Sequence, residues 1–262
     1  VNGAELWRTD GTAAGTSMVK DLNPGPVGSL HPNFSPTALA HNGILYFAAV
    51  TAANGRELWR TDGTADGTFL VKDINPGPAD GGVFNLPNCG GTILFRADNG
   101  TAGAEPWRTN GTEAGTALVK DIRPAGGSNP SAMTAVNGAC YFTANDGVTG
   151  FELWRTDGTD AGTALVKDIR PGLTNTSISG LTAMGGALYF AADDGVNGSE
   201  LWRSDGTAAG TALLKNIAPG VSGSSPQNLV VNGSRLLFSA NSPAGMELWA
   251  TAGTPETTVM VK

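Results

Sequence analysis

The stretch ELWRTDGTDAGTALVKDI, residues 152–169, decides the fold because close copies of it recur in register along the whole chain. The other copies occupy residues 5–22, 57–74, 105–122 and 200–217, with a shorter, divergent copy at 247–262. The tryptophans of successive copies lie 52, 48, 47, 48 and 47 residues apart. This period indicates either propeller blades or two-helix repeats.

Two-helix repeats are excluded by the pattern of apolar residues. No window has apolar residues at helical spacing, and Gly, Thr and Asn interrupt every stretch. In residues 128–169, Asn137-Gly138 predicts a two-residue hairpin turn, because both of its positions readily take positive φ. We expect the strands around it at Ala132–Val136, Cys140–Thr143, Glu152–Thr156 and Ala164–Asp168. Four antiparallel strands with short links describe one blade of a β-propeller.

The predicted fold is therefore an all-β propeller of four-stranded antiparallel blades. Six copies of the third and fourth strands are present, but only five of the first and second: 37–47, 84–95, 132–142, 181–190 and 229–238. We expect one propeller domain over residues 1–262, with a half blade at 1–21 and full blades at 22–74, 75–122, 123–169, 170–217 and 218–262. Six blades, one of them incomplete, are expected; the alternative is a five-bladed ring in which residues 1–21 are surplus.

The recurring string resembles the ELWxxDGT repeat family of bacterial, often myxobacterial, surface or secreted proteins. The resemblance covers essentially the whole chain and implies a β-propeller at the cell surface or outside the cell. The TDGTxxGT segment is also similar, in position and chemistry, to the Asp-box turn of sialidase-type propellers. Neither resemblance defines a biochemical activity.

Composition excludes several classes of partner. The net charge is −7, with 16 basic against 23 acidic residues and no Lys/Arg cluster, so nucleic acid is not an expected partner. No apolar run is long enough to insert into a membrane. The spacing of Cys89 and Cys140 indicates neither a disulfide framework nor a metal site, and we expect two small buried residues.

The polar turns are expected to be structural. The turn carboxylate is replaced by Asn110 in one copy and by Ala252 in the last, which suits a hydrogen-bonded turn better than a catalytic group. The loops at Asp98-Asn99, Asn145-Asp146 and Asp193-Asp194 could hold Ca²⁺, but they lack the spacing of a calcium loop, and plain polar turns are expected. No cofactor is predicted.

Catalysis finds little support in the sequence. The histidines are His31 and His41, and none of the common hydrolase, phosphate-loop or dinucleotide motifs occurs. We expect a protein that is not an enzyme.

The repeated Glu, Trp and Arg define the candidate ligand site. Aromatic faces stack on the C–H groups of sugars, while carboxylate and guanidinium groups bond their hydroxyls. The candidate ligand-binding residues are Glu57, Trp59, Arg60, Glu105, Trp107, Arg108, Glu152, Trp154, Arg155, Glu200, Trp202 and Arg203. The same residues also suit a core between blades, with each Arg paired either to an aspartate of the VKD segment, such as Asp73 or Asp168, or to a neighbouring Glu.

The sequence therefore favours a multivalent, lectin-like propeller that binds glycans at sites related by blade symmetry. The alternative is a non-catalytic structural or protein-interaction propeller of a secreted or surface protein. If the ring lacks two strands, its exposed edge should recruit a second copy, giving a homodimer, or be covered by a terminal segment.

Overall fold

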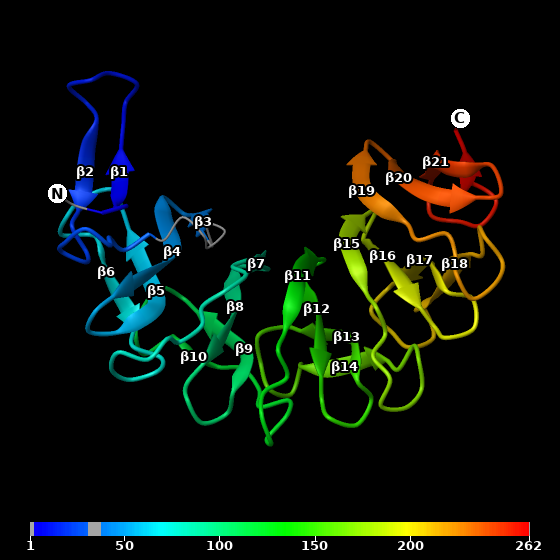
Figure 1. Ribbon diagram of the computed structural model, residues 1–262, viewed down its shortest axis with the longest axis horizontal. Coiled ribbons are helices and arrows are strands. Elements are labelled where there is room, and N and C mark those ends of the chain that lie inside the picture. Colours follow the sequence, from blue (N-terminus) through cyan, green and yellow to red (C-terminus); the bar gives the residue numbers. More distant parts are fainter. Residues whose placement is uncertain (1–2, 31–37, 262) are drawn as a thin grey trace. The chain divides into compact units, whose positions relative to one another are not determined.

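The computed structural model describes residues 3–30 and 38–261 and confirms the predicted all-β propeller fold. The described residues form five four-stranded sheets and one two-stranded sheet, and they contain no helix, so none that could span a membrane (Figure 1). We number the two-stranded half blade as blade 1 and the four-stranded sheets as blades 2 to 6. The chain divides into two compact units, Val1–Asn129 and Pro130–Lys262, which are described separately.

The first unit holds blades 1 to 3. Blade 1 consists of β1 (Leu6–Arg8) and β2 (Ser17–Lys20). Blade 2 consists of β3 (Ala38–His41), β4 (Ile44–Thr51), β5 (Gly55–Thr61) and β6 (Phe69–Lys72). Blade 3 consists of β7 (Asn88–Cys89), β8 (Thr92–Asp98), β9 (Ala104–Thr109) and β10 (Ala117–Leu118).

The second unit holds blades 4 to 6. Blade 4 consists of β11 (Ser131–Val136), β12 (Ala139–Asn145), β13 (Phe151–Thr156) and β14 (Ala164–Lys167). Blade 5 consists of β15 (Ser179–Met184), β16 (Ala187–Asp193), β17 (Ser199–Ser204) and β18 (Ala212–Lys215). Blade 6 consists of β19 (Gln227–Asn232), β20 (Arg235–Ser242), β21 (Gly245–Thr251) and β22 (Val259–Met260).

Within each blade, consecutive strands pair antiparallel in chain order. The predicted hairpin turn in blade 4 is confirmed, since Asn137 and Gly138 have φ of 49° and 80°. In that blade Phe142 faces Trp154, and the equivalent residues Phe190 and Trp202 face each other in blade 5. The repeated string thus occupies the same register in each blade.

The apolar core lies between neighbouring blades. In the second unit, Leu153, Val166 and Ile169 of blade 4 pack in one cluster with Phe190 and Trp202 of blade 5. In the first unit the same positions of blades 2 and 3 form an equivalent cluster. Within each unit, a blade therefore packs its Leu-Val-Ile side against the Phe-Trp side of the next blade, so the repeat buries its own apolar residues.

The cysteines depart from the prediction in one respect. Cys89 and Cys140 are both buried, as expected, but neither is a free thiol, because both are disulfide-bonded.

Candidate binding sites

In five of the six repeats the glutamate is buried, and it bonds the link that follows its blade. Glu200 is 0 % exposed, and its carboxylate accepts hydrogen bonds from the backbone N–H groups of Ile217 (3.1 Å), Ala218 (2.9 Å) and Ser224 (3.1 Å). The Ser224 hydroxyl also donates to it. One carboxylate thus satisfies buried donors at both ends of the link.

The same arrangement recurs in other blades. Glu105 accepts from the N–H of Ile122 and from both the N–H and the hydroxyl of Ser128. Glu152 accepts from the N–H of Ile169 and from the hydroxyl of Thr176. A ligand could reach these predicted site carboxylates only by displacing the link.

Glu57 is the exception. It is 0 % exposed and accepts from the N–H of Asn75 at 3.0 Å. At the position where other blades have Ser or Thr, the chain has Gly81, and Oε2 of Glu57 has no hydrogen-bond partner among the described residues. The pKa of Glu57 is raised to about 7, mainly by burial and to a smaller extent by the nearby Asp73 carboxylate.

Burial also raises the pKa of Glu152 to about 7, although the Thr176 hydroxyl and the Ile169 N–H act to lower it. The pKa of Glu105 is raised for the same reason. In each case removal of the carboxylate from water outweighs the hydrogen bonds that favour its charged form.

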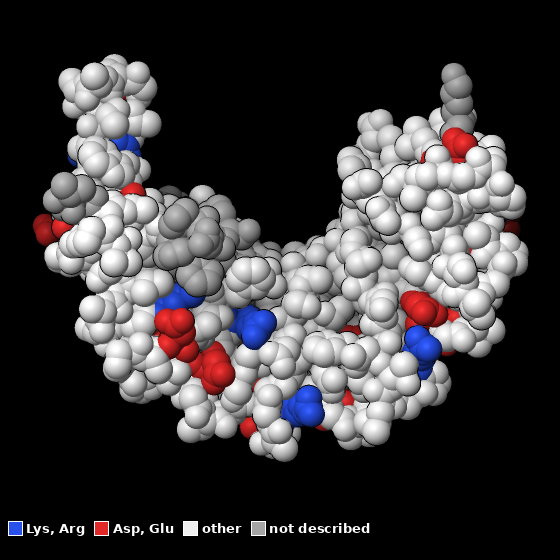
Figure 2. Space-filling model, viewed as in Figure 1, with Lys and Arg blue, Asp and Glu red and all other residues white. Residues whose placement is uncertain are grey.

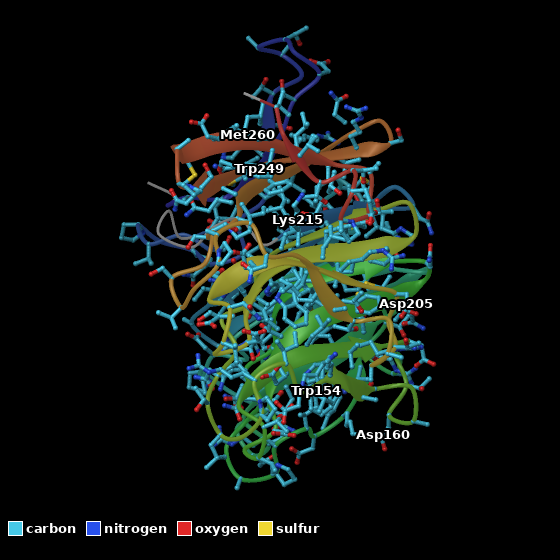
Figure 3. The ribbon with its side chains drawn as sticks, turned by 90° about the vertical axis from the view of Figure 1, so that its right-hand side faces the viewer. Trp154, Asp160, Asp205, Lys215, Trp249 and Met260 are labelled. Carbon is cyan, nitrogen blue, oxygen red and sulfur yellow. The ribbon has the colours of Figure 1, made fainter. Side chains whose placement is uncertain are left out.

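Five of the six repeat tryptophans are buried. Trp59, Trp107, Trp154 and Trp202 are 5–9 % exposed, and their indole nitrogens are enclosed with no hydrogen-bond partner among the described residues. Figure 3 shows Trp154 among the side chains packed between the sheets, whereas Asp160 and Asp205 lie at the outer edge. Trp7 of blade 1 differs, because it is 59 % exposed.

The arginines are the members of the predicted set that reach the surface. Arg108 is exposed, while Arg60, Arg155 and Arg203 are half-buried. The arginines of blades 1 and 2 reach the turn of the next blade: Arg8 donates to the carbonyl of Gly63 and Arg60 to that of Gly111, both at 3.2 Å.

The predicted ion pair between Arg60 and Asp73 is wrong. Arg60 lies opposite Phe69, whereas Leu58 lies opposite Lys72, so the register places Asp73 beside Glu57 instead. The guanidinium lies over the Phe69 ring, 5.1 Å from its centroid. The sequence pattern missed this because it does not show how far along the hairpin the two charges are separated.

The lysine of the VKD segment also holds the next blade. Lys20, Lys167 and Lys215 donate to the carbonyls of Thr68 (2.8 Å), Thr211 (2.7 Å) and Thr258 (2.7 Å). Each acceptor is the last threonine of the turn in the following blade. In blade 1, Arg8 and Lys20 therefore both donate to the same turn of blade 2, at Gly63 and Thr68.

The TDGTxxGT turn is a hydrogen-bonded structure, as predicted. Oδ1 of Asp157 accepts from the N–H (2.9 Å) and the hydroxyl (2.7 Å) of Thr159. Asn110 makes the same two bonds to Thr112, at 3.0 Å and 2.7 Å. The amide thus replaces the carboxylate without loss of geometry, which confirms the structural interpretation of this residue.

The loops considered for calcium are also tight polar turns. Oδ1 of Asp146 accepts from the N–H groups of Val148 and Thr149, and Oδ1 of Asp194 accepts from those of Val196 and Asn197. Among residues 3–30 and 38–261, no three His, Cys, Asp or Glu side chains are grouped as a metal site would need. The expectation that these loops bind no calcium remains a prediction.

Histidine 31 lies outside the described residues. His41 ends β3, and its ring nitrogens lie 3.1 Å from Nδ2 of Asn42 and 2.9 Å from Nδ2 of Asn88. Neither partner is a carboxylate or a nucleophile, so His41 belongs to a polar cluster rather than to a catalytic pair.

Small open cavities lie where an arginine of the repeat meets a turn. One of about 210 Å³ is lined by Arg108, Thr92, Thr109 and Asn110, among others. Another, of about 300 Å³, lies between Arg8 of blade 1 and Thr64 in the turn of blade 2. Guanidinium, hydroxyl and amide groups therefore reach solvent together at these turns.

A further cavity, of about 350 Å³, breaks the repeat symmetry. It is lined by Arg56, Asp80, Gly82, Val83, Phe84 and Arg96. Arg56 is 8 % exposed, and its Nε donates to the carbonyl of Val83 at 3.2 Å. Burial lowers the pKa of Arg56, while the Asp80 carboxylate acts to raise it. Figure 2 shows basic and acidic groups close together on the face in view, over the part of the chain that includes β5 and β8.

Sequence reasoning overlooked this cavity, although a signal was present. The residue before the repeat glutamate is Arg56 in blade 2 but Ala4, Ala104, Phe151, Ser199 or Met246 elsewhere. The residue after the second-strand phenylalanine is Arg96 in blade 3 but Ala48, Thr143, Ala191 or Ser239 elsewhere. Comparing the repeats position by position would have singled out both arginines.

Fold and site together place this chain in the broad class of β-propellers with a repeated, internally bonded blade. No protein-family model and no curated protein sequence matches it.

Solved structures of similar fold include puromycin hydrolase (13 % identity, TM-score 0.57, 94 % of this chain and 39 % of that one). Others are a structure from a study of two prolyl endopeptidases (16 % identity, TM-score 0.58, 98 % and 39 %) and oligopeptidase B from Leishmania major (10 % identity, TM-score 0.54, 97 % and 37 %). This chain spans about two fifths of the length of each. At such identities the likeness shows the fold alone.

Proposed function

We propose that the protein is a non-catalytic, multivalent binding propeller of a secreted or cell-surface protein, with glycans as its ligands. The observation that carries the proposal is the set of small polar cavities formed where a repeat arginine meets a DGTxxGT turn. Hydroxyl, amide and guanidinium groups at a shallow opening suit the planar array of hydroxyls on a sugar.

The repeated residues take different roles in this proposal. The arginines Arg60, Arg108, Arg155 and Arg203, with the polar residues of the turns, contact the ligand. The glutamates and tryptophans of the candidate set support these contacts from below, because both are buried. Sites of weak individual affinity gain strength when several engage one branched or polymeric glycan.

A second candidate is a structural or protein-interaction propeller. It is favoured by the contacts of Arg8 and Arg60, which already bond the next blade without any ligand. On this view the repeated string serves only to join blades, and partners bind elsewhere on the surface.

The two candidates are separated by a glycan array followed by a titration monitored by NMR. We expect Arg155→Ala and Arg203→Ala to weaken binding of any glycan found on the array, because they remove a proposed ligand contact. Both variants should fold, since the last repeat has Ala250 at this position and forms its strand. The matched control is Trp154→Phe, which should lower stability but not the affinity of the folded protein. No binding at millimolar protein concentration would reject the glycan proposal in favour of the second candidate.

A further inference from the structure

Three departures from the repeat meet at one cavity in the first unit. Arg56 comes from β5, Arg96 from β8, and Phe84 from the link between blades 2 and 3. Phe84 exchanges two backbone hydrogen bonds with Arg96, at 3.0 Å and 2.9 Å. In blades 4, 5 and 6 the residues opposite the Arg96 position are Ser131, Ser179 and Gln227. The repeat alone does not account for large and charged residues at all three positions.

We propose that the cavity lined by Arg56, Phe84 and Arg96 binds the carboxylate of an acidic sugar residue, a hexuronate. This site is single, and it goes beyond the proposed function because it uses none of the repeated arginines at the turns.

The charges of the cavity favour an anion. Among the described residues that line it, two guanidinium groups accompany the one carboxylate of Asp80, so a neutral ligand would leave this group of side chains with a net positive charge. Asp80 is already engaged, since its Oδ1 accepts from the backbone N–H of Arg56 at 2.8 Å. A planar guanidinium matches a carboxylate through two parallel hydrogen bonds.

One hydrogen bond orients the Arg96 guanidinium group, and other N–H donors of the group remain available. Its Nη2 donates to Oδ1 of Asn129 at 3.1 Å, while its Nε is buried without a hydrogen-bond partner among the described residues. A guanidinium has five N–H donors, so the Asn129 contact orients the group and leaves others for a ligand. An arginine fixed in this way loses little conformational entropy on binding.

The remaining groups favour a sugar over a simple inorganic anion. Phe84 is 39 % exposed and offers an aromatic surface to C–H groups. The exposed carboxylate of Asp80 can accept hydrogen bonds from ring hydroxyls. A volume of about 350 Å³ is at the small end of ligand pockets, which suits one sugar residue rather than an extended chain.

The test is a titration of the whole chain with galacturonate and with methyl galactoside, which differs mainly by lacking the carboxylate. Binding is measured by calorimetry and by the NMR shifts of the Val83 and Phe84 amides. We expect galacturonate to bind at least tenfold more tightly than methyl galactoside. Arg96→Ser, which copies Ser239 of blade 6, should weaken galacturonate binding at least tenfold.

The controls separate this site from the turns. Arg108→Ala should leave galacturonate binding unchanged, because Arg108 does not line the cavity. Phe84→Ser, which copies Ser131 and Ser179, should weaken both sugars by a similar factor. An unfolding curve for each variant shows whether a loss of binding reflects a loss of fold.

Three results would overturn the proposal. They are equal affinity for the two sugars, galacturonate binding that survives Arg96→Ser, and tighter binding of an acetylated acidic dipeptide than of galacturonate. Absence of galacturonate binding at tens of millimolar would also reject it. The glycan proposal for the turns is tested separately, by the effect of Arg155→Ala and Arg203→Ala on glycan binding.

Discussion

The carboxylate of Asp157 occupies the space that a β-carbon on Gly162 would need. The same overlap holds for Asp62 and Gly67 in blade 2. In the last repeat both positions change together, to Ala252 and Thr257. There the Thr257 hydroxyl accepts from the N–H groups of Ala252 (3.1 Å) and Thr254 (3.2 Å). The second glycine of DGTxxGT is therefore required by the aspartate, and the two residues form one unit.

This coupling predicts a non-additive pair of substitutions. Gly162→Thr alone should cost about 1–3 kcal/mol of unfolding free energy, because the new side chain collides with Asp157. Adding Asp157→Ala, as in the last repeat, should recover at least about 1 kcal/mol of that loss. Urea unfolding of the two single variants and the double variant measures the coupling. Strictly additive effects would show that the two positions are independent.

The first glycine of the turn is required by the backbone instead. Gly158 has φ of 90°, a conformation that residues with a β-carbon rarely adopt. We expect Gly158→Val to cost about 1–3 kcal/mol. Asp157→Asn is the matched control and should leave the unfolding midpoint essentially unchanged, since Asn110 forms the same turn in blade 3. Similar small effects of both substitutions would contradict this description of the turn.

The fold could be predicted from the sequence because the repeat occurs six times, and the five copies with a first hairpin all have a glycine-containing turn such as Asn137-Gly138. The number of predicted strand pairs also indicated a half blade followed by five full blades. The contacts of the charged groups could not be predicted. Whether Arg60 meets Asp73 depends on the register of one hairpin, and whether Glu200 is a ligand or an anchor depends on where a later link passes.

The candidate site was harder to predict than the fold, because the residues that recur most regularly have a structural role. The most regular residues, Glu and Trp, are each buried in five of the six repeats. The cavity at Arg56 and Arg96 is instead marked by departures from the repeat, and the two arginines are 40 residues apart in the chain (96 − 56). Only the fold shows that they line the same space.

The missing hydroxyl beside Glu57 predicts a stabilising substitution. Gly81→Ser should supply the donor that Ser128 and Ser224 give to the glutamates of their own blades. Gly81 does not have a positive φ, so a side chain is not strained there, and the Glu57 carboxylate has to shift to admit it. We expect a gain of about 1 kcal/mol and a lower pKa of Glu57. Ser224→Gly is the reciprocal control and should lose a similar amount. No gain from Gly81→Ser together with no loss from Ser224→Gly would show that the hydroxyl is unimportant.

The raised pKa values predict how stability depends on pH. Glu57 and Glu152 have pKa values of about 7 in the folded protein, against 4.5 when unperturbed. Between these values the folded state keeps a proton that the unfolded state has released, so stability falls as pH rises from about 4.5 to about 7. The loss should be about 1–3 kcal/mol for each glutamate.

Unfolding free energies measured across this range test the prediction, with Glu57→Gln and Glu152→Gln as variants in which the slope should flatten. The turn aspartates do not interfere, because the pKa values of Asp62, Asp157 and Asp205 lie below 3.8. Stability that increases with pH over the same window would contradict the burial of these carboxylates.

The central claim is that the repeated glutamate anchors the link to the next blade. Residue-resolved hydrogen exchange in Glu200→Ala tests it most directly, because the N–H groups of Ile217, Ala218 and Ser224 all bond to that carboxylate. We predict that these three amides lose their protection. The Ile169 amide, which is bonded to Glu152 at 3.0 Å in the preceding blade, should keep it. Unchanged protection at Ile217 and Ser224 in a folded variant would contradict the account.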